Sequence, residues 1–334
     1  MDLTTRYLGL RLRNPLIASA SPLNGELSTL RALEDYGAGA VVLPSIFEEQ
    51  VVAEQRHVEQ LMQPSASGFA EAQSYFPVYG GYGFGPGRYL ETIRRAKAAL
   101  AIPVIASLNC VTADGWADYA RDLESAGADA IELNIYVVAA ELSLTGAAVE
   151  QRHLDAVRAV KASVQTPVAV KIGPYFSAPG AMALALAAAG ADGLVLFNRV
   201  YQPDIDIVTL RRSLNLDLST PAEMRLPLMW TSILHGRTGA SLAASTGVES
   251  AEDVFKYLLA GADAVMTTSA LLRHGPRHMG PLVAGLGDLL TARGVDRVDQ
   301  VRGRMSEHVL GDAAGLARDS YIRMLQGYPA AQSS

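Results

Sequence analysis

Small polar and amide residues follow a series of short apolar runs along this chain. They are Ala18-Ser19-Ala20-Ser21, Ser45, Asn109, Asn134, Lys171, Asn198, Ser245-Thr246-Gly247 and Thr268-Ser269. Any one of them alone is better explained by a loop contact or a helix cap. Together they offer hydrogen-bond donors and acceptors to a flat ligand that is rich in heteroatoms. They contain no cluster of carboxylates of the kind that binds a metal or hydrolyses a glycoside.

The last two of these groups have the composition of a phosphate site. Ser245-Thr246-Gly247 precedes a predicted helix that starts near Ser250, and Thr268-Ser269 precedes a short helical turn. Backbone N–H groups at helix starts, left accessible by Gly and small side chains, bind anions. Ordinary capping by Ser and Thr is the alternative. Because the two groups follow the last two strands, where barrels often bind phosphate, we predict a phosphate site there.

Lys171 and Cys110 are the two other reactive side chains in these runs. Lys171 directly follows three apolar residues. A lysine in that place extends to the surface, pairs with an anionic ring, or forms a Schiff base with a carbonyl substrate. Cys110 is the one cysteine, so an internal disulfide is excluded and an inert buried thiol is expected. The six histidines lack the spacing of a zinc site, and no metal site is predicted.

Four Gly-Ala pairs indicate how the chain positions these residues. Helix-like runs break at the pairs that begin at Gly37, Gly127, Gly190 and Gly261, and an apolar strand follows within a few residues. Gly supplies the left-handed cap that residues with a Cβ atom resist. A chain that repeatedly returns from helix to strand by a short joint builds parallel βα units.

Eight strands are predicted, and helices separate most of them. The strands cover residues 15–20, 40–43, 103–108, 130–133, 167–171, 193–197, 240–244 and 264–267, and the helices cover 26–36, 88–100, 116–126, 148–164, 180–189 and 251–260. This alternation predicts a (β/α)8 TIM barrel, in which the residues at the strand ends meet at one face. An open doubly wound sheet is the alternative, but no Gly-x-Gly-x-x-Gly turn follows its first strand.

A single barrel domain is predicted over residues 1–305, followed by a helical C-terminal extension and tail over 306–334. Two stretches, 61–87 and 199–227, are expected to be long loops at the C-terminal face of the strands. Loops of that length in a compact domain are usually lids or binding loops, with surface disorder as the alternative for the first. Five aromatic residues of the first loop suit a roof over a flat ring: Tyr75, Phe76, Tyr79, Tyr82 and Phe84.

Composition excludes several classes of function. The 334 residues carry a formal net charge of -6 and lack the basic footprint that nucleic-acid binding leaves. No apolar run is long enough to span a bilayer, and the first residues lack the pattern of a secretory signal. A cytoplasmic location without membrane contact is therefore expected. One cysteine cannot hold an iron–sulfur cluster, so redox chemistry would require a borrowed cofactor.

Several segments, in this order and at these strand ends, resemble the dihydroorotate dehydrogenase family of FMN-dependent barrels. The similarity extends to about residue 305 and is carried by residues 8–16, 131–135, 167–171, 196–199, 245–248 and 261–271. The resemblance implies that FMN is the cofactor and that the backbone of Ser19, Ala20 and Ser21 lies against its ring. It also implies a homodimer.

Further flavin contacts follow from the same resemblance. Asn109 and Asn134 would contact the ring, and Lys171 would stabilise its anionic N1–O2 edge. The strand that ends at Ser45 leads to the same pocket. The phosphate would be held by Gly247, Thr268 and Ser269, and Thr246 belongs to the same cofactor-binding set.

The chain departs from the family pattern where the substrate should bind. The family places a Cys or Ser base on the loop after the Glu-Leu-Asn strand, and that position is Val137 here. An aliphatic side chain accepts no proton. The Asn that closes the family motif is Ala139, and the lysine expected after the second strand is Pro44. Tyr136 is the candidate replacement, although a phenol's ordinary pKa near 10 makes it a poor base.

Two residues after the sixth strand remain candidates for substrate contact. Asn198 provides an amide, and the planar guanidinium of Arg199 suits a carboxylate. The alternative for Arg199 is an ion pair with Asp204 or Asp206.

The sequence therefore predicts an FMN-dependent oxidoreductase that transfers hydride between a small, dihydropyrimidine-like ring and flavin N5. Lys171 and Tyr136 are the catalytic candidates, and the replacement at Val137 predicts a substrate other than dihydroorotate. A separate electron-transfer protein or a soluble acceptor is the expected partner, with a place in pyrimidine metabolism. The alternatives are a Schiff-base lyase or aldolase barrel that uses Lys171, and a flavin-binding partner protein without turnover.

Overall fold

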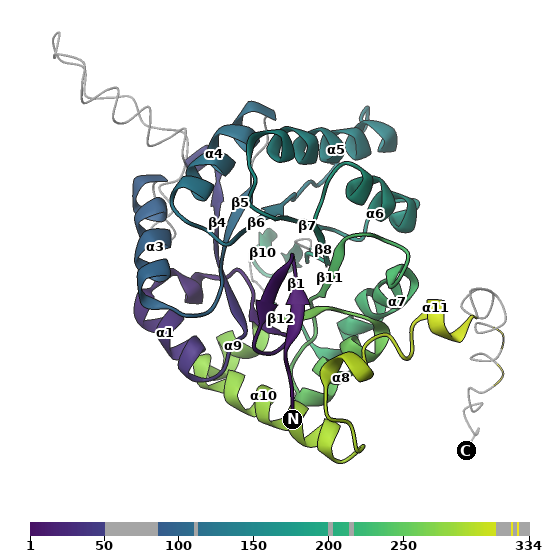
Figure 1. The fold of residues 1–334 in the computed structure, drawn as a ribbon. Coiled ribbons are helices and arrows are strands. Elements are labelled where there is room, and N and C mark those ends of the chain that lie inside the picture. Colours follow the sequence, from purple (N-terminus) through teal and green to yellow (C-terminus); the bar gives the residue numbers. More distant parts are fainter. Residues whose placement is uncertain are drawn as a thin grey trace, which may run out of the picture.

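The computed structural model describes residues 1–50, 86–109, 113–199, 203–213 and 217–311, with residues 322 and 326. Eight parallel strands close into a barrel, and helices surround it (Figure 1). The barrel strands are β3 (Leu16–Ala18), β4 (Ala40–Phe47), β5 (Val104–Asn109), β6 (Ala130–Asn134), β7 (Val168–Ile172), β8 (Gly193–Leu196), β11 (Ser241–Ala244) and β12 (Ala264–Thr267). Each of them overlaps one predicted strand. The predicted (β/α)8 barrel is confirmed, and the open sheet is excluded.

The helices pack around the barrel, and six of them match predictions. The matched helices are α1 (Leu27–Asp35), α3 (Pro86–Ala99), α4 (Ala113–Ser125), α5 (Gly146–Ser163), α6 (Pro179–Ala188) and α8 (Ala251–Ala260). The others are α7 (Arg225–Leu234), α9 (Ser269–His274), α10 (Met279–Thr291) and α11 (Glu307–Leu310), with 3-10 turns η1 (Pro22–Gly25), η2 (Pro221–Met224), η3 (Pro276–His278) and η4 (Val298–Gln300). No helix of the described residues is long and apolar enough to cross a membrane.

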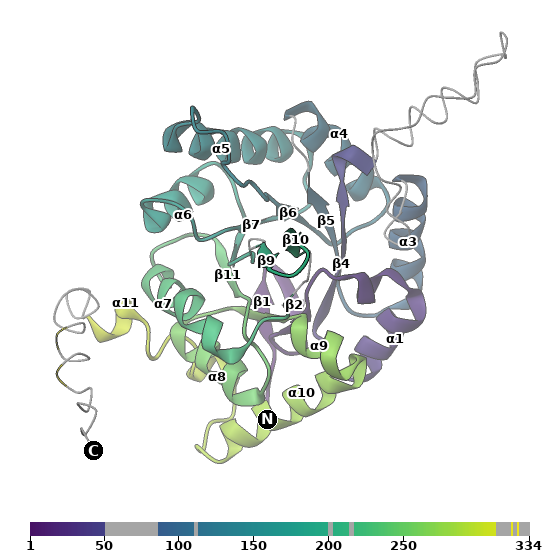
Figure 2. The same cartoon turned by 180° about the vertical axis from the view of Figure 1, so that it is seen from behind.

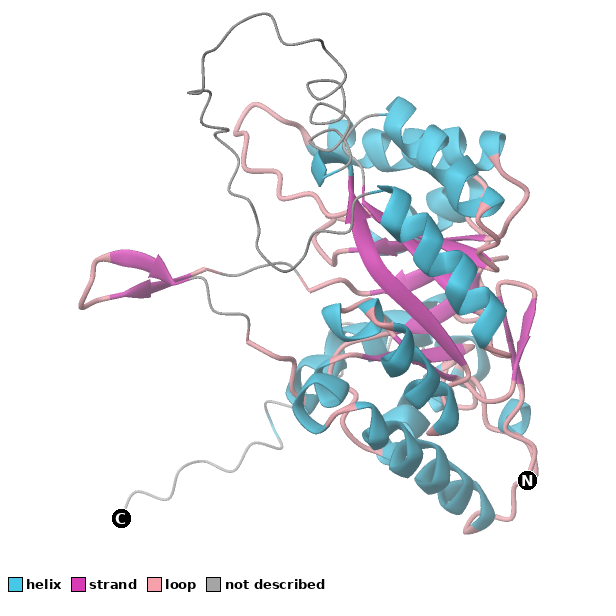
Figure 3. Ribbon diagram, turned by 90° about the vertical axis from the view of Figure 1, so that its left-hand side faces the viewer, coloured by secondary structure: helices cyan, strands magenta, loops and turns pink. Residues whose placement is uncertain are grey.

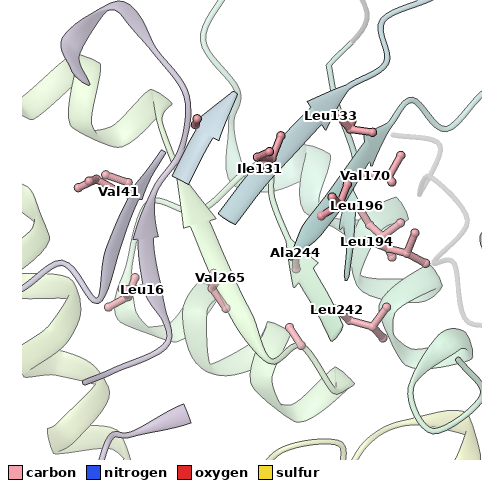
Figure 4. Close-up of a cluster of buried hydrophobic side chains, with 14 of the residues drawn as sticks. Leu16, Val41, Ile131, Leu133, Val170, Leu194, Leu196, Leu242, Ala244 and Val265 are labelled. Atoms are coloured by element: carbon pink, nitrogen blue, oxygen red, sulfur yellow. The ribbon is translucent and has the colours of Figure 1, made fainter. Parts of the chain in front are cut away.

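Alternate residues of the strands supply two apolar clusters. Leu16 and Val41 point outward toward the helices, as Figure 4 shows for this outer layer. Their neighbours Ile17 and Val42 belong to the inner cluster. This alternation is the period-2 pattern of a strand whose two faces are both buried. The apolar runs that predicted the strands are therefore explained by burial on both sides.

An N-terminal hairpin closes one end of the barrel. It consists of β1 (Thr5–Tyr7) and β2 (Leu10–Leu12), and it lies in front of the barrel in Figure 1. Tyr7 and Leu8 join the inner cluster. Gly193 leaves space for this packing, because a Cβ atom on it would lie 2.4 Å from Leu8 Cδ2 and the Leu8 side chain would have to shift. With this end filled, a ligand site must lie at the opposite end, where the strands terminate.

The prediction of one long loop over residues 199–227 was wrong. The segment contains a hairpin of β9 (Asp204–Asp206) and β10 (Arg211–Ser213), then η2 and the start of α7. The hairpin projects away from the barrel in Figure 3 and lies in front of it in Figure 2. Four of its aliphatic side chains are exposed: Ile205, Ile207, Val208 and Leu210. Such short strands, without a buried face, leave no apolar alternation from which to predict them.

Parts of the other predictions lie outside the described residues. The first predicted loop shares only its last two residues with the described chain, and these begin α3 at Pro86. Proline suits that position because its missing N–H has no partner in the first turn of a helix. Cys110 and most of the predicted extension over 306–334 also lie outside the described residues.

Candidate functional site

A buried ion pair lies inside the barrel, near its open end. Lys171 of β7 and Glu132 of β6 approach to 3.8 Å between Nζ and Oε1, and Glu132 is fully buried. Lys171 Nζ also donates to Ser19 Oγ at 3.3 Å. Glu132 Oε2 has no hydrogen-bond partner among the described atoms. The carboxylate therefore fixes the position of a cationic Nζ that faces the mouth of the barrel.

Ser107 of β5 continues this network from Glu132. Its Oγ lies 3.5 Å from Glu132 Oε1 and 2.7 Å from Ser45 Oγ. Tyr89 Oη accepts from the Ser107 N–H at 3.0 Å and donates to the Ser107 carbonyl at 3.2 Å. Burial raises the pKa of Tyr89 far above 10, so its hydroxyl stays protonated and holds Ser107 in place.

Two asparagines extend the network to the open face. Asn134 Nδ2 donates to Ser45 Oγ at 3.1 Å, and Asn198 Nδ2 donates to Asn134 Oδ1 at 2.6 Å. The two amides and Ser45, which were singled out at separate strand ends, are thus in direct contact. Ser107 and Glu132 were missed, although a carboxylate between apolar residues of a predicted buried strand is a readable signal.

An open hollow of about 680 Å³ lies beside this network at the strand ends. Nine of the predicted site residues line this hollow. They are Ser19, Ala20, Lys171, Asn198, Arg199, Thr246, Gly247, Thr268 and Ser269. The other predicted contacts, Ser21, Ser45, Asn109 and Asn134, do not line this hollow. Ser21 and Asn109 are buried, the first beside η1 and the second at the end of β5.

The chain turns sharply where β11 ends, and Gly247 is required there. Thr246 and Gly247 have φ angles of 82° and 75°. A Cβ atom on Gly247 would lie 2.8 Å from the Thr220 carbonyl oxygen and 3.0 Å from Met224 Cβ. Tyr257 donates from below to the Thr246 carbonyl at 2.8 Å. The turn is therefore packed on both sides, and Thr246 and Gly247 line the hollow.

Ser219 bridges the two loops that were predicted to bind phosphate. Its Oγ accepts from the Gly247 N–H at 3.2 Å and donates to Ser269 Oγ at 2.9 Å. Arg273 Nη2 donates to the Ser219 carbonyl at 2.7 Å. Ser219 was missed, because only its distant partners reveal its role. The guanidinium of Arg273 is itself paired with Glu249, at 2.6 Å from Nη1 to Oε2. Small hydroxyl groups beside a tight glycine turn are the features here that suit an anion.

Arg199 forms an ion pair, but with a partner that the sequence did not indicate. Its guanidinium lies 3.0 Å from Glu223 Oε1 of η2. The predicted alternatives, Asp204 and Asp206, were wrong, because β9 carries them away with the projecting hairpin. Asp206 instead accepts from backbone N–H groups of its own turn, at 2.8 Å from Val208 N. The charge of Arg199 is therefore already compensated.

A second hollow, of about 1090 Å³ and partly open to solvent, adjoins the loop after β6. Its lining is largely apolar and aromatic: Ile135, Tyr136, Val137, Val138, Ala139, Val149, His153, Gly173, Tyr175, Phe176, Asn198 and Pro203. We call this hollow the side chamber. Asn198 also lines the first hollow, so the two share a wall. Tyr136 and Val137 are 36% and 38% exposed, and Val137 is thus available to a ligand.

Comparison with known proteins identifies relatives over most of the chain. The family described as Dihydroorotate dehydrogenase matches residues 2–290. A Methanosarcina acetivorans protein named dihydroorotate dehydrogenase B (NAD(+)), catalytic subunit, is 30% identical over 309 residues, covering 90% of this chain and 95% of its own. A Thermoplasma acidophilum protein of the same name is 29% identical over 279 residues, covering 82% and 89%. An Aeropyrum pernix relative, whose name refers to dihydroorotate dehydrogenase A (fumarate), is 29% identical over 317 residues, covering 90% and 97%.

Proposed function

Because this chain belongs to the dihydroorotate dehydrogenase family of flavin-dependent oxidoreductases that act on CH–CH bonds, we propose that it binds FMN and oxidises or reduces a small dihydropyrimidine-like ring. The observation that carries the proposal is the hollow at the strand ends. It brings Lys171, the Asn198 amide and the tight turn of Thr246 and Gly247 to one face of the barrel. FMN needs the same three features, because its ring edge accepts negative charge and its chain ends in phosphate.

The residues present fit FMN at both ends of the hollow. Lys171, fixed by Glu132, would face the ring edge that becomes negative on reduction. Ser19 and Ala20 would contact the ring through their backbone. The close packing around Gly247 leaves no room for a Cβ atom, and its N–H points to Ser219 Oγ. We propose that the phosphate binds between this turn and Ser269, beside Ser219.

When bound, FMN would supply hydride transfer at N5, and the protein would position the ring, the substrate and a proton. Lys171 would favour negative charge at its end of the hollow, because its ammonium has three donors and the contacts to Glu132 and Ser19 leave one for a ligand. Asn198 connects the hollow with the side chamber and would orient the substrate through its amide. Arg199 contributes N–H groups from the adjoining wall, while Glu223 compensates its charge.

We propose that the substrate differs from dihydroorotate. Val137 replaces the family base, and it lines the side chamber. Pro44 and Ala139 replace two further polar contacts of the family. The substrate would therefore retain a ring CH–CH bond but lack the groups that these contacts recognise.

The electron acceptor is proposed to be a separate electron-transfer protein or a soluble molecule. Two of the relatives are named as catalytic subunits of an NAD(+) enzyme, and one name refers to fumarate. We also propose a homodimer, supported by the exposed aliphatic residues of the β9–β10 hairpin, which are costly to leave in water. Light scattering of the wild type and of Val208→Asp would test the dimer.

Anaerobic reduction tests the proposed activity. The purified, FMN-loaded protein is mixed with dihydrouracil, dihydrothymine or dihydroorotate, and the flavin absorbance is followed. Bleaching by an uncharged ring supports the proposal, whereas bleaching by dihydroorotate alone contradicts the change of substrate. If none of them bleaches the flavin and borohydride traps a carbonyl compound on Lys171, the Schiff-base alternative holds instead.

A further inference from the structure

His153 lines the side chamber, although it lies on α5 and outside the loops predicted to form the site. The imidazole is nearly buried, at 3% exposure. Its Nδ1 lies 2.8 Å from the Val149 carbonyl oxygen, one turn earlier on the same helix. A carbonyl only accepts hydrogen bonds, so Nδ1 carries the proton and Nε2 holds a lone pair in the neutral ring.

The surroundings of His153 favour this neutral form. Burial lowers the pKa of His153 below its ordinary value of 6.5, although the hydrogen bond to the Val149 carbonyl and, to a lesser extent, Glu150 on the same helix oppose part of that shift. Phe176 packs edge-on against the imidazole, with 5.3 Å between ring centroids. Because Nδ1 forms its hydrogen bond within its own helix, Nε2 is the ring nitrogen that is left to contact a ligand in the chamber.

His153 is the one imidazole among the described residues that line the chamber. Among the described residues that line it, none is Lys, Arg, Asp or Glu, and the other titratable side chains are the phenols of Tyr136 and Tyr175. Arg199 lies outside this lining and is paired with Glu223. An apolar, aromatic lining with one amide and one imidazole suits an uncharged ring rather than a carboxylate.

We propose that the side chamber binds an uncharged dihydropyrimidine-like ring and that His153 Nε2 accepts the proton that Val137 cannot. The inference rests on the proposed flavin chemistry. One ring C–H bond breaks with its electron pair, which leaves as hydride to the oxidised flavin. The C–H bond on the neighbouring carbon breaks and gives its proton to Nε2, and its electron pair forms the C=C bond. The imidazolium then returns the proton to solvent.

Histidine NMR tests the ligand contact without turnover. FMN-loaded protein labelled with 15N-histidine is titrated with uracil, or with orotate, which adds a carboxylate to the same ring. We expect His153 to show a protonated Nδ1 and an Nε2 signal that shifts with uracil and stays in place with orotate. A response to orotate alone, or to neither compound, overturns the inference. A protein without bound flavin would instead overturn the proposed function.

A matched pair of variants tests the proton transfer. His153→Asn retains a donor for the Val149 carbonyl but cannot accept a proton. His235→Asn removes an imidazole with the same kind of bond, 3.0 Å from Nδ1 to the Gly261 carbonyl oxygen, away from the chamber. We expect His153→Asn to slow flavin reduction by dihydrouracil about 10²–10⁴-fold, the usual contribution of a general base, and His235→Asn to leave the rate unchanged.

The pH dependence separates a base from a packing residue. The wild-type rate should fall as acid protonates His153, and the residual rate of His153→Asn should lack that fall. Equal rates in the two variants, or an unchanged acid limb in His153→Asn, overturn the assignment. If circular dichroism shows that His153→Asn does not fold, the same rate and pH measurements are made on His153→Gln. The NMR titration of the wild type then tests the ligand contact independently.

Discussion

Replacing Gly247 by alanine tests the proposed phosphate-binding turn, because the structure leaves no room for the added methyl group. The new Cβ atom would lie 2.8 Å from the Thr220 carbonyl oxygen and 3.0 Å from Met224 Cβ. Its backbone would also have to keep a φ of 75°, which residues with a Cβ atom resist. Gly294 provides a matched control, since its φ is 64° and no atom lies within 4 Å of an added Cβ.

The two variants separate backbone strain from steric overlap. A left-handed conformation costs a residue with a Cβ atom about 1–2 kcal/mol, and this term applies to both glycines. Overpacking against neighbours adds about 1–3 kcal/mol, and it applies only to Gly247. We therefore expect Gly294→Ala to lower the free energy of unfolding by about 1–2 kcal/mol and Gly247→Ala by about 2–5 kcal/mol.

Urea denaturation and the flavin content of the purified proteins provide the measurements. Gly294→Ala should retain FMN, whereas Gly247→Ala should lose it or bind it with a much larger Kd. Equal losses of stability in the two variants would contradict the packing of Thr220 and Met224 on the turn. A destabilised Gly247→Ala protein that binds FMN with the wild-type Kd would refute the phosphate assignment.

Three further predictions concern the network and the chamber. Lys171→Met leaves the Glu132 carboxylate buried without its partner and should lower the free energy of unfolding by about 3–5 kcal/mol; adding Glu132→Gln should recover most of this loss but not the flavin affinity, and unchanged stability in the single variant would argue against the pair. Val137→Ser places a hydroxyl at the family base position on a 38% exposed site, so stability should change by less than about 0.5 kcal/mol while flavin reduction by dihydroorotate becomes faster; Val137→Ala, which shortens the side chain without adding a hydroxyl, is the matched control, and an unchanged rate with Ser would count against the role of this position. Burial lowers the pKa of His153, so the unfolded chain binds more protons than the fold, and the free energy of unfolding should fall as pH drops below 6.5; His153→Asn should reduce this slope in urea titrations, and an identical slope would contradict the burial of a neutral imidazole.

The barrel could be predicted because its signals are local. Each Gly-Ala pair ends a helix just before a strand, and Gly261 indeed caps α8 with a φ of 116°. The apolar runs report burial on both faces of the strands, so they mark all eight correctly. In a closed parallel barrel, the strand ends then place Asn134, Asn198 and Lys171 at one face without further information.

The remaining features depend on contacts that are distant in sequence. Glu223 pairs with Arg199 only because η2 folds back over the strand ends. Ser219 has its role through Gly247 and Ser269, which lie on two other loops. His153 looks like an ordinary helix residue until the chamber beside α5 is seen. The short hairpin strands β9 and β10 lack a buried face and therefore lack an apolar period.

The visible spectrum of the purified protein tests the central claim most directly. We predict a yellow protein that releases FMN on denaturation. The ratio should be about one FMN per chain, because the proposed flavin site is one hollow with one phosphate site. Gly247→Ala, purified in parallel, should be paler. A colourless protein that takes up no flavin after incubation with FMN would contradict the claim that the strand ends of this barrel form a flavin site.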